Sequence, residues 1–278
     1  MSLNGSRAGR VATYATLGIV TVVALFPVFW TVSTSVKKSR DSIAKPPKFF
    51  DFAATTKNYR GLFDKQEFTH VVKTTVLITG WSTVLCVAAG ALMAYALARH
   101  RRFPGRRPLE AGLIVVRAIP GIVLMVPLYQ IVSRLHLYDK VSVMVVIYAA
   151  VNLPFSVWLM TSFIEQIPVE LEEAAKTEGA GPFSVLARVV FPLAVPGLAA
   201  TMIFVALLAW NEFLIPVLLG GDNAKTLPVY ISAFVSNRNL DWGPMAAASC
   251  LAIVPIALLT IAMQRRLVSG LSSGALKD

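Results

Sequence analysis

The sequence is poor in charge, and this shortage excludes several classes of protein. Only 15% of its 278 residues are charged, whereas 56% are hydrophobic, and the mean hydropathy is +0.66. A soluble fold, a disordered chain, a coiled coil and a DNA-binding domain all need more charge than this. The composition therefore indicates a membrane protein without a nucleic-acid partner, although the formal net charge is +11.

Cysteine and histidine are also scarce. Cys86 and Cys250 both lie in apolar runs, where we expect two buried small hydrophobes rather than a disulfide framework. His70, His100 and His136 are scattered without metal-ligand spacing. No phosphate-binding loop of the GxxxxGK[ST] type occurs. We therefore expect no catalytic site, no metal site and no cofactor bound by this chain.

Six apolar segments are long enough to cross a bilayer as helices. A bilayer core about 30 Å thick takes roughly 20 helical residues. The first segment is too long for a cleaved signal peptide and is expected to be a retained anchor. The predicted spans are residues 11–36, 74–98, 111–132, 141–164, 193–219 and 245–263. The expected fold class is an all-α integral membrane protein with six transmembrane helices.

The distribution of basic residues predicts the orientation. Arginines cluster in the loop after the second span, and basic residues also occur before the first span and after the last, so both termini are expected in the cytoplasm. The external segment after the first span is basic too, but much of its charge lies far from the span ends. The expected cytoplasmic segments are 1–10, 99–110, 165–192 and 264–278, and the external ones are 37–73, 133–140 and 220–244. The natural location is a bacterial plasma membrane, whose lipid headgroups suit the basic clusters.

The segment 165–192 differs from the other expected cytoplasmic segments because it is acidic. Pro168 suits a first helical position, the acidic residues that follow suit the positive end of a helix dipole, and Gly179 ends the helix. Leu171, Ala174 and Ala175 fall on one helical face. The pattern predicts a short helix with small residues on that face. Taken alone, it fits a plain connector between two spans as well as a docking surface.

Part of this segment resembles the EAA motif of ABC-importer permeases. The family pattern is Glu-Ala-Ala, three residues, Gly, nine residues and Ile-x-Leu-Pro. The spacing of Glu173-Ala174-Ala175, Gly179 and Val189-x-Phe191-Pro192 matches it, with two apolar replacements. In that family the loop forms a coupling helix that docks in a cleft on a cytoplasmic ATPase. The resemblance implies the type I ABC importer permease fold, with the coupling helix between spans 4 and 5. The ATPase-coupling residues that it implies are Leu171, Glu173, Ala174, Ala175, Gly179 and Pro192.

Other segments resemble the permeases of carbohydrate importers. They are Ala94-Tyr95-Ala96-Leu97-Ala98-Arg99, Leu153-Pro154-Phe155-x-x-Trp158-Leu159 and Trp210-Asn211-Glu212-Phe213. The C-terminal segment resembles the tail of the six-span subunit of maltose-type importers, which reaches between the ATPase subunits. The tail residues implied to contact the ATPase are Gly270, Leu271, Ser272, Ser273 and Gly274. By composition alone, this Gly/Ser-rich terminus fits a frayed end.

The resemblance also implies a set of partners. A second permease subunit would complete a heterodimer, and two copies of a cytoplasmic ABC ATPase would hold ATP and Mg. An external solute-binding protein or lipoprotein would deliver the solute. We expect residues 227–242 to meet that protein, and the segment after the first span to meet it or the partner permease.

Five polar residues inside the predicted spans are candidates for the solute pathway. An arginine at the centre of a membrane helix costs roughly 2.5–3.5 kcal/mol and usually faces protein or water. The candidates are Arg117, Gln130, Asn152, Asn211 and Glu212. Structural alternatives stay open: Arg117 can extend to the membrane surface, and the others can form hydrogen bonds between or within helices.

The nature of the solute is also open. The leading hypothesis is uptake of a mono- or oligosaccharide by an ATP-driven importer. The alternative is the same architecture for glycerol phosphate or another polar metabolite, because Arg117 suits an anion. A stand-alone channel or membrane enzyme predicts a self-contained pore or a cluster of acid, base or metal ligands, and leaves the EAA motif unexplained.

Overall fold

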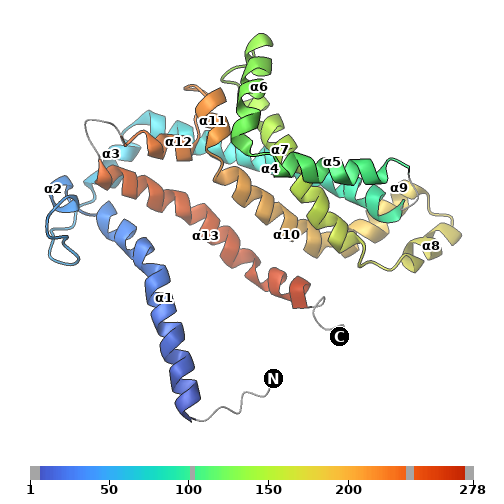
Figure 1. Ribbon diagram of the computed structural model, residues 1–278, viewed down its shortest axis with the longest axis horizontal. Helices are drawn as coiled ribbons and strands as arrows, with labels where there is room; N and C mark the ends of the chain where they lie inside the picture. The colour runs from blue at the N-terminus through green and yellow to red at the C-terminus, as the bar shows by residue number, and fades with distance from the viewer. Residues whose placement is uncertain (1–6, 101–103, 236–240, 273–278) are drawn as a thin grey trace. The chain divides into compact units, whose positions relative to one another are not determined.

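The computed structural model describes residues 7–100, 104–235 and 241–272, and within them the chain is helical without a β-strand. The predicted all-α class is thus confirmed. Figure 1 draws these helices in chain order, from α1 in blue to α13 in red. The chain divides into two compact units. One comprises Met1–Phe68 and Ile231–Val254, and the other comprises Thr69–Tyr230 and Pro255–Asp278.

The first unit contains α1 (Arg7–Ser35), α2 (Ser39–Ser42) and α3 (Lys57–Phe63). The side chains of residues 9–29 are all exposed, and the helix is apolar over this length, as suits contact with lipid. After α1 the chain folds back onto the helix end. Asn58 donates from Nδ2 to the carbonyls of Ser35, at 2.8 Å, and Lys37, at 2.9 Å. The Lys37 ammonium lies 4.1 Å from the centre of the Trp30 ring, and burial lowers its pKa.

The second unit is built around the three long apolar helices α4 (Gln66–Arg99), α7 (Val141–Ile164) and α10 (Phe191–Trp210). Small residues let these helices approach closely, as is common in membranes. A Cβ added at Gly90 of α4 would overlap Ser156 of α7, and one at Gly197 of α10 would lie 2.5 Å from the Phe163 ring of α7. The two glycines therefore set the spacing of the bundle.

Two predicted spans are interrupted in the structure. The segment 111–132, expected as one helix, consists of α5 (Arg106–Ala118) and α6 (Gly121–Arg134), bent by 98°. Pro120 causes the break, because the residue before a proline avoids helical angles, and Ile119 has φ −71° and ψ 123°. The segment 193–219 is likewise divided, since α10 ends at Trp210 and α11 (Leu214–Leu219) begins after a short break.

Within the described residues, five helices are long and apolar enough to cross a membrane, and the bent pair α5–α6 makes a sixth when it counts as one span. This agrees with the six spans that the sequence predicts. The spanning ranges are Gly9–Ser35, Gln66–Arg99, Val141–Ile164, Pro182–Trp210 and Trp242–Ile261. The last belongs to α13 (Trp242–Ser272), which follows α12 (Leu227–Ser232).

Short elements join α7 to α10. They are α8 (Glu170–Thr177), α9 (Pro182–Val185) and a π-helical stretch, Leu186–Val190, that runs directly into α10. Pro192 has no N–H to donate to the carbonyl four residues earlier, and the widened turn before it suits that loss. Because α7 is 24 residues long, it spans about 36 Å. Helix α8 and the turn before α7 therefore lie at opposite ends of the bundle.

Candidate functional site at helix α8

Helix α8 forms where the acidic segment predicts it. Its first turn carries Glu170, Glu172 and Glu173, which face the positive end of the helix dipole. At its other end Gly179 has φ +90°, a conformation that side chains with a Cβ rarely adopt. The N–H of Ala180 then donates to Ala175 O at 2.9 Å, which closes the helix end.

One glutamate of α8 is buried and anchors the helix to the end of α4. The side chain of Glu172 is 1% exposed and that of Arg99 is 10% exposed. Arg99 donates from Nε to Glu172 at 2.5 Å and from its second amino group to Ile167 O at 2.9 Å. Tyr95 donates from its hydroxyl to the other carboxylate oxygen of Glu172 at 2.9 Å. Both oxygens of the buried carboxylate are therefore satisfied by α4.

The opposite side of α8 is exposed. Leu171, Glu173 and Ala174 are exposed, and Ala175 is half-buried against a core cluster. A groove of about 460 Å³ runs between α8 and the start of α10. Its lining residues are Leu171, Ala174, Ala175, Glu178, Arg188, Val189, Pro192 and Leu193.

The predicted coupling residues are thus mostly brought together. Leu171, Ala174, Ala175 and Pro192 line the one groove. Glu173 is exposed on the same helix without lining it, and Gly179 ends the helix.

The predicted tail residues lie at the edge of the described chain. Gly270, Leu271 and Ser272 form the last turn of α13, so the helix continues beyond the span end expected at residue 263. Ser273 and Gly274 lie outside the described residues.

Arg117 is exposed in the last turn of α5, beside α7. Its guanidinium carbon lies 4.8 Å from the centre of the Phe155 ring. Phe155 lies near the middle of α7, about 15 Å along the helix from the end nearest α8. Arg117 also lines a groove of about 760 Å³ between α5 and α7, with Glu110 and Glu165 among the other lining residues.

Asn211 and Glu212 lie at the break between α10 and α11 rather than inside a continuous span. Asn211 is exposed and donates from Nδ2 to Leu207 O at 2.8 Å. Glu212 accepts the N–H of Leu214 at 2.9 Å, so it caps the start of α11. The single helix expected over 193–219 is therefore wrong at this point. Glu212 accepts the N–H groups of Leu214 and Ile215 at the start of α11, and the Asn211 side chain bonds back to the carbonyl of Leu207, which also accepts the Asn211 N–H.

The two helix breaks adjoin. A Cβ added at Gly121, the first residue of α6, would lie 4.0 Å from Leu214, the first residue of α11. The other two pathway candidates lie elsewhere. Gln130 is exposed on α6, and Asn152 of α7 donates from Nδ2 to Tyr148 O at 2.9 Å.

Comparison with known proteins identifies the family. The family model described as binding-protein-dependent transport system inner membrane component matches residues 86–273, more than half of the chain. This chain belongs to that family. This chain is 36% identical to the trehalose transport system permease protein SugB of Mycobacterium tuberculosis, over 96% of this chain and 98% of SugB. It is 30% identical to the trehalose/maltose permease MalG of Thermococcus litoralis, over 93% and 94% of the two chains.

A solved structure shows the same fold. A chain of a bacterial ABC transporter involved in the import of the acidic polysaccharide alginate matches this chain with a TM-score of 0.77. Sequence identity is 23%, and the match covers 95% of this chain and 99% of the other. The importer permease fold that the EAA resemblance implies is therefore confirmed.

The sequence did not predict the contacts of Glu172 with Arg99 and Tyr95 that anchor α8. Tyr95 and Arg99 lie in the segment 94–99 that resembles carbohydrate-importer permeases, but no role is predicted for them. Glu172 directly precedes the EAA motif, and the sequence predicts for it only a place at the positive end of the helix dipole. Two signals were present: an arginine at the very end of a long apolar helix, and a pair of adjacent glutamates of which only one matches the motif. Pairing them requires the fold, because they lie 73 residues apart.

Proposed function

We propose that this chain is a permease subunit of an ATP-driven, binding-protein-dependent sugar importer. The observation that carries the proposal is helix α8, which is anchored on one side by the buried Glu172 and exposes Leu171, Glu173 and Ala174 on the other. A helix held in this way can transmit a push from a docked partner into α4. Family membership and the two sugar-permease relatives support the assignment.

The docked partner in this proposal is a cytoplasmic ABC ATPase, present in two copies. ATP and Mg bind there, and this chain contributes no catalytic group. ATP-driven closure of the two ATPases moves α8, and the Arg99–Glu172 ion pair passes the movement to α4. Two permease conformations that differ by a few kcal/mol are then biased by ATP and by the loaded binding protein. A second permease subunit supplies the other half of the pathway.

The orientation follows from the same proposal. If α8 meets an ATPase, its end of the bundle faces the cytoplasm, together with both termini and the arginine cluster of residues 99–110. The turn before α7 and the loop after α11 then face outwards. The end of α13 and the tail, Gly270–Gly274, contact the ATPases. Deleting residues 270–278 should lower uptake more than it lowers expression.

The solute is a mono- or oligosaccharide in this proposal, by similarity to the trehalose and maltose permeases. Arg117, Asn211 and Glu212 lie at or beside two adjoining helix breaks, and broken helices are where transporters commonly place polar contacts. We propose that these three residues face the solute pathway. Gln130, exposed on α6, and Asn152, which bonds to Tyr148 O within α7, are the weaker candidates. An anionic solute such as glycerol phosphate is the alternative that Arg117 favours.

Reconstituted transport tests the proposal. The complete complex is placed in proteoliposomes with ATP on the α8 side and its solute-binding protein on the other. Uptake of radiolabelled trehalose or maltose that needs both ATP and the binding protein is the expected result. Uptake of radiolabelled glycerol 3-phosphate instead would assign the alternative solute. Solute flux through this chain alone, without ATP, would contradict the importer.

A further inference from the structure

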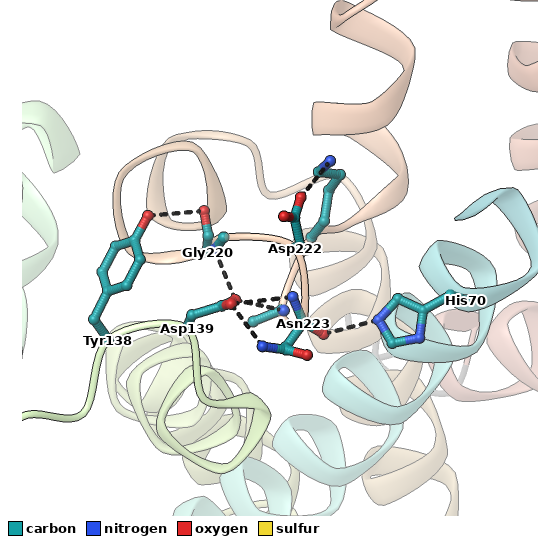
Figure 2. A network of polar contacts seen from close by, with 9 residues as sticks. His70, Tyr138, Asp139, Gly220, Asp222 and Asn223 are labelled. Atoms are coloured by element: carbon teal, nitrogen blue, oxygen red, sulfur yellow. Dashed lines mark hydrogen bonds and ion pairs between the residues drawn. The ribbon is translucent and has the colours of Figure 1, made fainter. Parts of the chain in front are cut away.

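One carboxylate organises the end of the second unit that lies opposite α8 (Figure 2). Asp139 is in the turn between α6 and α7. It accepts the backbone N–H groups of Gly221 and Ala224, both at 2.7 Å, and that of Asn223 at 3.1 Å. It also accepts the side-chain Nδ2 of Asn223 at 2.9 Å. Four donors from the loop after α11 thus converge on a single side chain.

The same loop is tied to α4. The Nε2 atom of His70 lies 3.2 Å from the carbonyl oxygen of Asn223, and a protonated Nε2 donates to it. The N–H of Leu227 donates to the Thr75 hydroxyl at 2.8 Å. The loop of residues 220–226 is therefore fixed both to the start of α7 and to α4, as Figure 2 shows for Asp139 and His70.

Contacts within the chain hold this loop in its shape. A Cβ at Gly221 would lie 2.8 Å from the Asp139 carboxylate, so only glycine fits against it. The backbone N–H groups of Gly221, Asn223 and Ala224 all donate to the Asp139 carboxylate, which holds this part of the loop. At its tip the side chain of Asp222 is 98% exposed and pairs only at the surface with Lys225, at 3.2 Å. A preformed loop with an exposed tip loses little conformational entropy when a partner docks.

We propose that Asp139 is a positioning residue that holds the loop of residues 220–226 in the shape that the external solute-binding protein recognises. The proposal rests on the proposed function, which places this end of the bundle outside the membrane. The exposed tip at Asp222 is then part of the recognised surface, whereas Asp139 acts through the loop and does not touch the partner.

The test uses the whole complex in lipid nanodiscs and the solute-binding protein recovered with it. Asp139→Asn keeps the size of the side chain but loses the charge and one of its acceptor oxygens. Hydrogen exchange of residues 219–226 should become faster in this variant. The concentration of binding protein that half-maximally stimulates ATP hydrolysis should rise about tenfold. Basal hydrolysis and the maximal stimulated rate should stay at wild-type values.

Two further variants separate positioning from a structural defect. Asp222→Lys, at the exposed tip, should raise the half-maximal concentration without changing hydrogen exchange. Asp64 is an exposed carboxylate after α3, and Asp64→Asn should change neither the half-maximal concentration nor hydrogen exchange. Unchanged half-maximal concentrations in both Asp139→Asn and Asp222→Lys would overturn the proposal, as would a fall of basal hydrolysis that accounts for the whole effect. Absence of stimulation in the wild-type complex would instead contradict the proposed function.

Discussion

Glu172 and Glu173 are adjacent on α8 but have opposite surroundings. The buried Glu172 pairs with Arg99, whose side chain is 10% exposed, whereas Glu173 is exposed. The EAA resemblance directs attention to Glu173 alone. Sequence cannot separate the two roles, because burial of one neighbour depends on Arg99, a residue far away in the chain. At this scale the fold adds the buried ion pair that supports α8.

We predict that Glu172→Gln destabilises the protein by about 3 kcal/mol, because it leaves Arg99 buried without its counter-charge. The matched variant Glu173→Gln should change stability by less than about 0.5 kcal/mol, since its side chain is exposed. Thermal unfolding of the purified complex measures both. Equal losses in the two variants would show that the buried ion pair does not anchor α8.

The pKa of Asp139 predicts a pH dependence. Burial raises that pKa, but hydrogen bonds from the backbone of Ala224, Asn223 and Gly221 outweigh burial and lower it. The ionised carboxylate therefore adds stability above the unfolded value of about 3.9, and this stability is lost as pH falls through the folded value. The difference in Tm between wild type and Asp139→Asn should be equal at pH 7 and pH 5 and shrink below about pH 4. Shrinkage already between pH 7 and pH 6 would be inconsistent with this account.

At the scale of elements, much was predictable from the sequence. Helix α7 has the bounds of the predicted span, Val141–Ile164, and α8 forms where the acidic segment and Gly179 place it. The breaks were not predicted, because apolar residues continue on both sides of Pro120 and of Asn211. Proline within a membrane helix is often tolerated, so its presence alone does not decide between a kink and a break.

The close contact between α4 and α7 predicts a selective effect of glycine substitution. Gly90→Ala should destabilise the bundle by about 1–3 kcal/mol, because the new methyl overlaps Ser156. Gly80→Ala, on the same helix, has nothing within 4 Å of its added methyl and should be neutral or slightly stabilising. Thermal unfolding in one detergent compares them. A loss in Gly80→Ala as large as that in Gly90→Ala would contradict the packing argument.

The backbone at the end of α8 predicts different effects for two glycine substitutions. Gly179→Ala should cost about 1–2 kcal/mol, because φ +90° is strained for a residue with a Cβ. Gly181→Ala should cost less, since Gly181 has φ −69° and open space around it. The number of ATP molecules hydrolysed per solute imported should rise in Gly179→Ala, because a distorted α8 couples less well. Equal coupling in both variants would remove Gly179 from the coupling role.

For the whole molecule, composition and apolar runs were enough to predict an all-α membrane protein, and one motif predicted its family. The residues of the solute pathway were harder to predict from the sequence. Whether Arg117, Asn152 or Glu212 faces solute depends on helix breaks and on side chains from other elements, and a second permease subunit would complete the lining. The loop held by Asp139 was not predicted either, because its partners lie 82 to 85 residues away.

The most direct test of the account is recovery of the assembled complex. The tagged chain is purified from its native membrane in mild detergent, and the co-purifying proteins are identified by mass spectrometry, for wild type and for Glu173→Lys. We predict that wild type brings an ABC ATPase, a second permease and a solute-binding protein, and that Glu173→Lys loses the ATPase or leaves its hydrolysis uncoupled from uptake. Recovery of this chain alone at stable yield, or wild-type transport by Glu173→Lys, would contradict the account.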